Sequence, residues 1–237
     1  MKLSTIVRAT VIGASVSLAL GACTAGPGAT QSGTSSQGAS DMTIGLTYIP
    51  NVQFAPVYVA DSQGLYNDAG VTATVRHHGS DEGLFTALLA GQEDVVIASG
   101  DEAAVAASQG MDLVSIGQYY ATYPGSVIVP ASSSITSLAD LAGKNIGIPG
   151  EYGSSYYATL AAITAGGLQT SDVTISSIGY TQQAALAAGQ VDAVVGFTNN
   201  DAVQMRLAGI DIQEIPLDGA STPLVAASII TTREWAQ

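Results

Sequence analysis

Residues 150–155, with the sequence GEYGSS, combine reactive side chains with the backbone pattern of a ligand-binding loop. They follow a strand-like run, NIGI, and precede an apolar run typical of a helix. Such a loop points the free N–H groups of a helix N-terminus at a ligand. A phosphate-binding P-loop needs a lysine after its glycines, and a nucleophile elbow needs G-x-S-x-G. This loop has neither, and Glu151 would oppose an anion, so we expect it to contact an uncharged polar group.

Tyrosine dominates the aromatic residues of this chain, with ten Tyr against three Phe and one Trp. Tyr152 lies in the GEYGSS loop, and Tyr119, Tyr120 and Tyr123 lie near the middle of the chain. A tyrosine ring stacks on flat molecules while its hydroxyl forms hydrogen bonds. With serine hydroxyls, asparagine amides and backbone N–H groups, these rings suit a neutral or weakly polar ring compound. We expect about half of the tyrosines to be ordinary core residues.

His77 and His78 are the only histidines, and they are adjacent at the end of a strand-like run. Neighbouring residues of a strand point to opposite faces. The two imidazoles therefore do not form a metal site, and we expect a solvated strand end instead.

From residue 42 onward, short β-rich runs alternate with Ala-rich helical runs. Strands are predicted for 42–49, 71–78, 93–99, 144–149, 173–179, 191–197 and 209–215, and helices for 54–63, 81–90, 101–109, 137–143, 154–165, 181–189 and 201–208. This alternation predicts an α/β fold with parallel sheets covered by helices.

The chain also resembles itself. The run that begins at Ala87 matches the run that begins at Ala184, with Asp94 aligned to Asp192. A period close to 100 residues is too long for a solenoid and predicts two similar lobes with a cleft between them. Shared Ala and Gly composition is the alternative explanation.

Ligands of such sheets sit beyond the carboxyl ends of the strands. Four loops are expected to meet there, at 49–54, 99–102, 150–155 and 198–201. Asp101 and Asn199, which lie in two of these loops, either contact the ligand or only cap their helices.

The N-terminal residues are those of an exported protein. Residues 1–23 carry two basic residues, a short apolar core and the ending LGAC, which resembles the lipobox of bacterial lipoproteins. The resemblance implies lipidation of Cys23, the only cysteine; the alternative is an ordinary signal peptide. Residues 24–41 have the composition of a flexible tether. Cleavage removes Lys2 and Arg8, so the formal net charge of −13 becomes about −15, which repels nucleic acid and anionic lipid.

Several runs carry a family resemblance: TYIPNVQFAPVYVADSQGLYNDAGV, SGDE, SLADLAGKNIGIPGEYGSSY and AALAAGQVDAVVGFTNND. Together they resemble the solute-binding lipoproteins of ABC importers, in the branch similar to thiamine-pyrimidine-precursor synthase. The resemblance implies a two-lobed, type II periplasmic-binding-protein-like α/β fold with mainly parallel sheets. It places lobe 1 at 42–124, lobe 2 at 125–224, and a strand returning to lobe 1 at 225–237.

The resemblance also implies a function. A monomer without a cofactor, lipid-anchored to the outer face of the bacterial cell membrane, captures a thiamine pyrimidine precursor or a riboflavin-like heterocycle and delivers it to the permease and ATPase subunits. Residues aligned with the family's binding loops are Asn51, Phe54, Ser99, Asp101, Tyr152, Ser154, Ser155 and Asn199, and Tyr123 joins them as a ring near the crossover between the lobes.

Two other functions remain open. One is an extracytoplasmic enzyme that uses Asp101 or Glu151 as acid or base; the other is a ligand-sensing domain. The pyrimidine-making enzyme of the family relies on a histidine, a lysine and a cysteine cluster, and this chain has no such cluster. The chain also stops at REWAQ, where the family continues with helices of lobe 1. We therefore expect a C-terminally truncated fragment that leaves an apolar face of lobe 1 uncovered.

Overall fold

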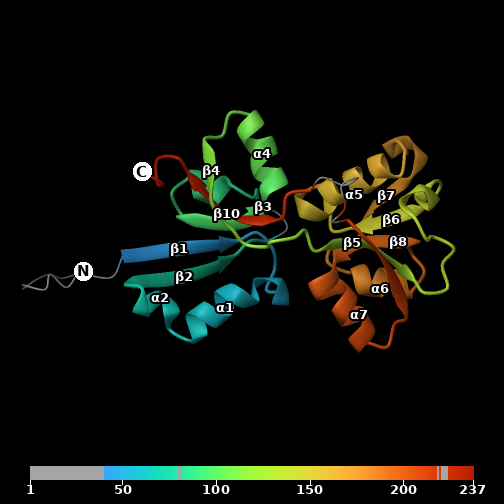
Figure 1. Cartoon of the computed structure of the whole chain (residues 1–237), viewed down its shortest axis with the longest axis horizontal. Coiled ribbons are helices and arrows are strands. Elements are labelled where there is room, and N and C mark those ends of the chain that lie inside the picture. The colour runs from blue at the N-terminus through green and yellow to red at the C-terminus, as the bar shows by residue number, and fades with distance from the viewer. Residues whose placement is uncertain (1–39, 80–81, 218, 220–223) are drawn as a thin grey trace, which may run out of the picture. The chain divides into compact units, whose positions relative to one another are not determined.

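Two five-stranded sheets organise the chain (Figure 1). They belong to a computed structural model that describes residues 40–79, 82–217, 219 and 224–237. The first sheet has the order β2-β1-β3-β10-β4, from β1 (Ser40–Leu46), β2 (Val71–His77), β3 (Val95–Ser99), β4 (Leu113–Gln118) and β10 (Ala227–Thr232). The second has the order β7-β6-β8-β5-β9, from β5 (Gly125–Pro130), β6 (Asn145–Ile148), β7 (Thr174–Ser177), β8 (Ala193–Phe197) and β9 (Ile212–Pro216). We call each sheet with its helices a lobe.

The two sheets have the same strand directions. In the first, β2, β1 and β3 pair in parallel, and β10 lies antiparallel between β3 and β4. In the second, β7, β6 and β8 pair in parallel, and β5 lies antiparallel between β8 and β9. One strand in each sheet therefore runs against the other four, which agrees with the expectation of mainly parallel sheets.

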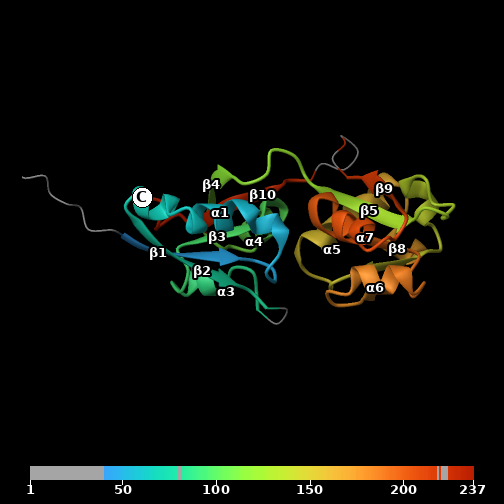
Figure 2. The ribbon, with the colours of Figure 1, turned by 90° about the horizontal axis from the view of Figure 1, so that it is seen from below.

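The chain passes between the lobes twice (Figure 2). Residues 119–124 lead from β4 to β5, and residues 217–226 lead from β9 to β10. The antiparallel strand of each sheet is thus the one that enters from the other lobe.

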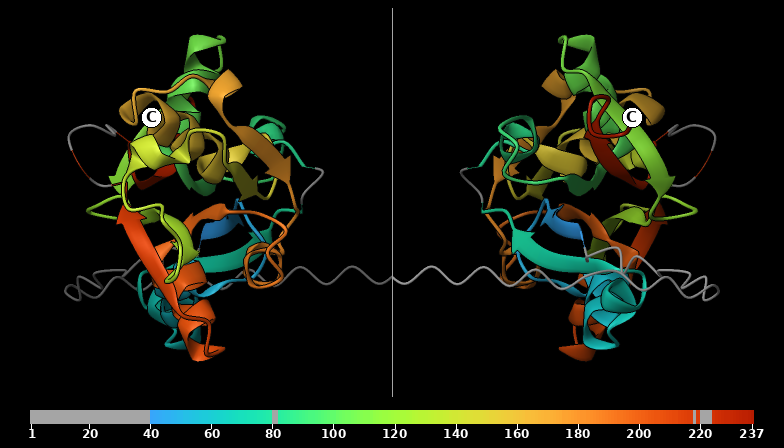
Figure 3. Two further views of the ribbon diagram at one scale, coloured as in Figure 1. Left: turned by 90° about the vertical axis from the view of Figure 1, so that its right-hand side faces the viewer. Right: turned by 90° about the vertical axis from the view of Figure 1, so that its left-hand side faces the viewer.

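Helices cover both faces of each sheet (Figures 1 and 3). The first lobe contains the 3₁₀ turn η1 (Val52–Phe54), α1 (Ala55–Ser62), α2 (Leu65–Asp68), α3 (Thr86–Leu89) and α4 (Gly100–Ser108). The second lobe contains η2 (Leu138–Leu141), α5 (Gly153–Ala165), η3 (Thr170–Asp172), α6 (Gln182–Ala187), the π-helical turn η4 (Thr198–Ala202) and α7 (Val203–Leu207).

Strand β3 shows how the core arises from the two-residue period of a strand. Val96 and Ala98 pack with α3 and α4, while Val95 and Ile97 pack on the opposite face with α1. Every residue of β3 is buried. Full burial of one Val or Ile side chain is worth roughly 1.5–3 kcal/mol, so a continuous apolar strand is most stable at the centre of a sheet covered on both sides.

The predicted strands all form, although most are shorter than their sequence patterns. Two strands were not among those predicted, β4 (LVSIGQ) and β5 (GSVIVP). Both flank the first crossover, where Gly, Pro and Tyr interrupt the apolar pattern. The helix predicted at 81–90 is confined to α3, and the helix predicted at 137–143 is the 3₁₀ turn η2.

An apolar hollow lies on the α1 side of the first sheet. It is lined mainly by aliphatic and aromatic side chains: Met42, Ile44, Pro56, Val57, Tyr66, Val95, Ile97, Ile116, Gln118, Tyr119, Ile229 and Trp235. Ile116 is 47% exposed and Trp235 is 43% exposed. Lobe 1 therefore carries an apolar face that is only partly covered.

Candidate functional site

A cleft lies where the carboxyl ends of β1, β3, β6 and β8 meet. It encloses about 850 Å³ of space, part of it open to solvent. Residues of all four predicted loops line it, as does the crossover at 119–120 and the segment after β2. The lining residues are Thr47, Tyr48, Gln53, Phe54, His78, Gly79, Glu82, Leu84, Ile97, Ala98, Ser99, Glu102, Tyr119, Tyr120, Pro149, Tyr152, Gly153, Ser154, Ser155, Tyr180, Phe197, Asn200, Asp201 and Ala227.

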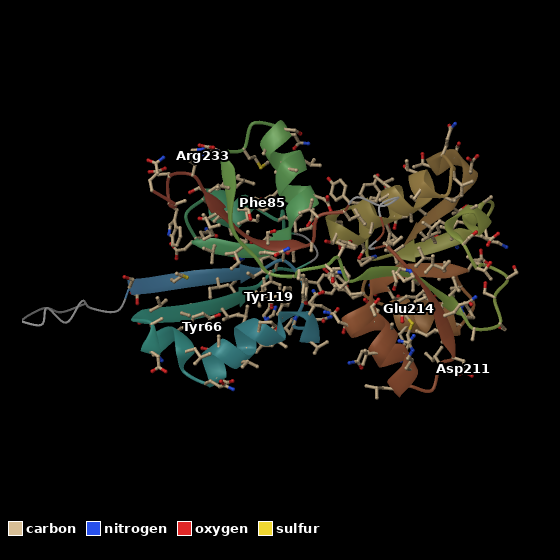
Figure 4. The ribbon with its side chains drawn as sticks, viewed as in Figure 1. Tyr66, Phe85, Tyr119, Asp211, Glu214 and Arg233 are labelled. Carbon is tan, nitrogen blue, oxygen red and sulfur yellow. The ribbon has the colours of Figure 1, made fainter. Side chains whose placement is uncertain are left out.

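Aromatic rings form much of the wall. Tyr48 of the first lobe meets Tyr180 of the second edge to face, with ring centroids 4.7 Å apart. Tyr119, which Figure 4 labels in the first lobe, meets Tyr120 in the same way at 4.9 Å. Both hydroxyls donate to the backbone carbonyl of Gln53. Burial raises the pKa of the Tyr48, Tyr119 and Tyr120 phenols. These groups therefore stay protonated at neutral pH and remain hydrogen-bond donors.

Two hydrogen bonds join the lobes across the cleft. The Gln182 amide donates to the Tyr48 hydroxyl at 3.3 Å, and the Asn199 amide donates to the Tyr120 hydroxyl at 3.1 Å. Each pairs a tyrosine of the first lobe or the crossover with an amide of the second lobe. Both bonds can break without leaving a buried charge, which suits a contact between parts that move.

Each lobe contributes one largely buried acid at the start of a helix. Glu102 lies in the first turn of α4 and Asp201 in the π-helical turn η4. Burial raises the pKa of Glu102 to about 8 and raises that of Asp201 as well, although the backbone N–H of Phe197 donates to Asp201 at 2.7 Å and lowers it. π-helical turns inside helices are frequent at functional sites.

A cluster of charged side chains lies at the end of β2, with His78 and Glu93 buried and Arg76 and Glu82 partly exposed. His78 is buried, and its Nε2 lies 2.8 Å from Oε1 of Glu93. Arg76 donates to the same oxygen at 2.6 Å and also pairs with Glu82 at 2.7 Å. Burial raises the pKa of Glu93, but the hydrogen bonds from His78 and Arg76 outweigh it and hold the pKa below its usual value. The carboxylate can only accept, so Nε2 of His78 carries a hydrogen.

The prediction of a solvated strand end at the histidines is therefore wrong. His77 is packed between Phe54 and Tyr58, with its Nδ1 3.1 Å from the backbone oxygen of Tyr48. Adjacent strand residues do contact different partners, as expected. The sequence could not reveal the partner of His78, because Glu93 comes from the loop before β3.

Five of the nine predicted ligand contacts line the cleft: Phe54, Ser99, Tyr152, Ser154 and Ser155. The other four, Asn51, Asp101, Tyr123 and Asn199, do not, and the structure gives each of them a protein partner. Cys23, the predicted lipidation site, lies outside the described residues.

The partners of those four residues explain their positions. Asn51 accepts from the backbone N–H of Gln53 at 3.0 Å and caps η1, and Asp101 accepts from the backbone N–H of Val225 at 3.0 Å. The N-cap of α4 is Ser99, so Asp101 is not a cap. Tyr123 is buried in the second lobe and donates to the backbone oxygen of Ser154 at 3.2 Å. Asn199 lies within η4 and bonds to Tyr120.

Sequence reasoning missed several lining residues, chiefly Tyr48, His78, Glu102, Tyr180 and Asp201. Glu102 and Asp201 lie inside the predicted loops. Successive residues of a helix point about 100° apart. The rotation of each helix about its axis therefore decides which residue of the loop faces the cleft, and the sequence does not reveal that rotation. Tyr180 follows a predicted strand directly, which is a signal that could have found it.

The described lining of the cleft offers an anionic ligand no Lys or Arg to pair with. Three acids line it: Glu82 is paired with Arg76, and burial raises the pKa values of Glu102 and Asp201. Among the described residues, no three His, Cys, Asp or Glu side chains are grouped closely enough to hold a metal ion. No helix in the described part of the chain is long and apolar enough to cross a membrane.

The sequence of this chain is similar to those of known proteins. The profile of the family described as "NMT1/THI5 like" matches residues 51–237. The riboflavin-binding protein RibY of Chloroflexus aurantiacus is 35% identical over 173 residues, which is 72% of this chain and 49% of that protein. The 4-amino-5-hydroxymethyl-2-methylpyrimidine phosphate synthase of Legionella pneumophila is 24% identical over 167 residues, covering 70% and 52% of the two chains. The chain spans about half the length of the curated relatives it matches.

Solved structures share the fold at low sequence identity. The periplasmic aliphatic sulphonate-binding protein SsuA of Escherichia coli superposes with a TM-score of 0.66 at 21% identity, covering 83% of this chain and 66% of that one. A Candida albicans protein with the generic periplasmic binding protein fold gives 0.60 at 14%, covering 82% and 64%. The two sheets are those of a periplasmic-binding-protein fold, and the family match over residues 51–237 shows that the chain belongs to the NMT1/THI5-like family.

Proposed function

We propose that this chain is the ligand-capturing part of an extracytoplasmic solute-binding protein of an ABC importer. Its ligand is a small uncharged aromatic heterocycle, such as a thiamine pyrimidine precursor or riboflavin. The observation that carries the proposal is the cleft itself: two lobes joined by two crossovers, with tyrosine rings from both sides lining the space between them. Flat rings and hydroxyl donors are suited to stacking and hydrogen bonding with such a ligand.

The ligand class follows from charge as well as shape. Relatives of this chain are named for riboflavin and for a pyrimidine, whereas the structural neighbour SsuA is named for aliphatic sulphonates. A sulphonate is an anion, and the described lining of this cleft offers it no Lys or Arg, while His78 in that lining is already hydrogen-bonded to Glu93. The chemistry of the cleft therefore supports a heterocycle over a sulphonate, and a free heterocycle over its phosphate ester.

The alternative of an extracytoplasmic enzyme has less support. Asp101 and Glu151, the acids predicted for that role, do not line the cleft. Asp101 accepts hydrogen bonds from the backbone N–H of Val225, and Glu151 is exposed. Neither is placed to exchange a proton with a bound molecule.

Location and partners belong to the same proposal. We infer that Cys23 is lipidated, so that residues 24–41 tether the lobes to the outer face of the cell membrane, and that the loaded protein docks on a permease with ATPase subunits. A captured ligand would hold the lobes together, and release would require them to part at the two crossovers.

Titration calorimetry on the full-length protein tests the ligand class. Riboflavin, 4-amino-5-hydroxymethyl-2-methylpyrimidine, its phosphate ester and an aliphatic sulphonate are titrated under the same conditions. The proposal expects saturable binding of at least one free heterocycle and weaker binding of the phosphate ester and the sulphonate. Tightest binding of the sulphonate would overturn it.

A further inference from the structure

Glu102 occupies an unusual place for an acid. It is the third residue of α4, three residues after the N-cap Ser99, in the capping-box pattern S-x-x-E. It lines the cleft, yet the whole residue is only 4% exposed. A carboxyl group buried to this extent is found paired or neutral, because an isolated buried charge is costly.

Only one of its oxygens is satisfied. A hydrogen bond from the backbone of Ser99 lowers the pKa of Glu102, whereas the Ser99 side chain accepts from the N–H of Asp101. Oε1 is buried without a hydrogen-bond partner among the described residues, so the bond with Ser99 engages Oε2. On the facing side, Gly153 opens α5 of the second lobe, and a Cβ built there would lie 3.5 Å from Oε1.

No described cation compensates this acid. The elements packed against α4 are β3, β4, β10 and α5. The three strands carry no ionisable side chain, and α5 carries only the phenols of Tyr156 and Tyr157. Asp101, beside Glu102 in α4, and Tyr123, from the crossover, are the other ionisable neighbours. Burial, with a smaller contribution from Asp101, raises the pKa of Glu102 to about 8.

We propose that Glu102, in its neutral protonated form, helps to recognise the ligand. Its Oε1 hydroxyl donates a hydrogen bond to an acceptor atom of the heterocycle, either a ring nitrogen or a carbonyl oxygen. The backbone bond at Oε2 leaves the proton on Oε1, the atom that lacks a partner. This inference rests on the proposed function and adds a specificity residue to it. A buried donor left unpaired also rejects ligands that lack an acceptor at that position.

An ionised Glu102 would select a ligand of different charge. A carboxylate at this place would favour a cationic ligand, and affinity would then rise as the pH rises. A neutral donor gives the opposite sign, because ionisation removes the donated proton and places a negative charge against the ligand's acceptor. The affinity for an uncharged heterocycle should therefore be constant at neutral pH and fall above the pKa of Glu102.

The experiment compares three variants with the wild-type full-length protein between pH 7 and 9.5, with riboflavin and 4-amino-5-hydroxymethyl-2-methylpyrimidine as probes. Glu102→Gln keeps a donor, an acceptor for the backbone of Ser99 and the side-chain shape, but it cannot ionise. Glu102→Ala removes the donor. Glu234→Gln is the matched control, because Glu234 is exposed and lies outside the cleft. Titration of the probe itself would affect every variant equally.

We expect wild type and Glu234→Gln to lose affinity by about tenfold per pH unit above the Glu102 pKa. Glu102→Gln should stay within about threefold of the wild-type affinity at pH 7 and lose this pH dependence, and Glu102→Ala should bind at least tenfold more weakly at pH 7. Equal pH profiles in wild type and Glu102→Gln, or affinity that rises with pH, would overturn the inference and leave the proposed function intact. A protein that binds neither probe at any pH would overturn both.

Discussion

Asp94 and Asp192 hold equivalent positions in the two lobes. The carboxylate of Asp94 accepts from the backbone N–H of Thr43 at 2.7 Å, and that of Asp192 accepts from the backbone N–H of Asn145 at 2.8 Å. In return, the backbone N–H of Asp94 donates to the carbonyl of Thr43, and that of Asp192 donates to the carbonyl of Asn145, each at 2.9 Å. The lobes therefore repeat one another down to individual hydrogen bonds, and this supports their repeat over shared composition.

Removing either carboxylate should destabilise its lobe. Asp94 also accepts from the indole of Trp235 at 3.0 Å, so Asp94→Ala should lower the free energy of unfolding by about 1.5–3 kcal/mol. Asp192 is exposed, and Asp192→Ala should cost about 1 kcal/mol. Chemical denaturation measures both, with the Asn variants, which keep an oxygen acceptor, as controls. Alanine and asparagine variants of equal stability would show that these bonds contribute little.

The GEYGSS loop should contribute to affinity more than to stability. Tyr152 is 40% exposed in the cleft, so Tyr152→Ala should weaken binding of the heterocycle about tenfold and leave the melting temperature nearly unchanged. Ser154→Ala should act in the same direction, because Ser154 lines the cleft and the substitution removes a hydroxyl from that lining. Calorimetric titration is compared with thermal melts.

Tyr66→Ala is the matched control for that pair. Tyr66 lines the apolar hollow of the first lobe and takes no part in the cleft. Its loss should lower the melting temperature without changing the affinity. If Tyr152→Ala behaves like Tyr66→Ala, then Tyr152 is a packing residue.

The stability of the ligand-free protein should also report the protonation of Glu102. Its pKa is 4.5 in the unfolded chain and about 8 in the folded protein. Between these values the unfolded chain binds fewer protons than the folded protein, so the stability that protonation contributes is present in full below pH 4.5 and is lost as the pH rises to about 8. The slope is at most about 1.4 kcal/mol per pH unit.

Urea denaturation at several pH values isolates this contribution when wild type and Glu102→Gln are compared. Other groups titrate in both proteins, and the difference between the two curves belongs to Glu102. We expect the wild type to lose stability relative to the Gln variant as the pH rises from 5 to 8. A constant difference would mean that Glu102 is ionised throughout.

Membrane attachment should depend on one residue. No other thiol can replace Cys23, so Cys23→Ser should abolish incorporation of a labelled fatty acid and release the protein from the membrane fraction. Metabolic labelling followed by fractionation measures both. Label retained on the Ser variant would contradict lipidation at this position.

The buried strands β3 and β8 and the four cleft loops could be predicted from the sequence because their patterns are local, whereas the buried strand β5 was missed. β3 and β8 are continuous apolar runs, and the loops that follow them begin with the polar residues that open helices. The type II fold came from the family resemblance, because strand order depends on pairing between distant segments, such as β10 with β3.

The composition of the cleft could be predicted only in part. Its tyrosine-rich character was visible in the sequence, but the pairing of Tyr48 with Tyr180 depends on how two lobes meet. Asp101 and Glu102 are adjacent in the sequence but have different surroundings. Glu102 lines the cleft, whereas Asp101 accepts a hydrogen bond from the backbone N–H of Val225. The rotation of the helix and its tertiary contacts determine which of the two acids lines the cleft, and neither can be predicted from the residue types.

The central claim is that the cleft captures a heterocycle and releases it unchanged. The most direct measurement is mass spectrometry of the compound that co-purifies with the full-length protein from cells supplied with riboflavin and 4-amino-5-hydroxymethyl-2-methylpyrimidine, released by denaturation. The account predicts one of these compounds, at its original mass and in an amount close to one per protein, and a marked loss of it from the Tyr152→Ala variant. Recovery of a chemically altered compound, or of neither compound, would contradict the account.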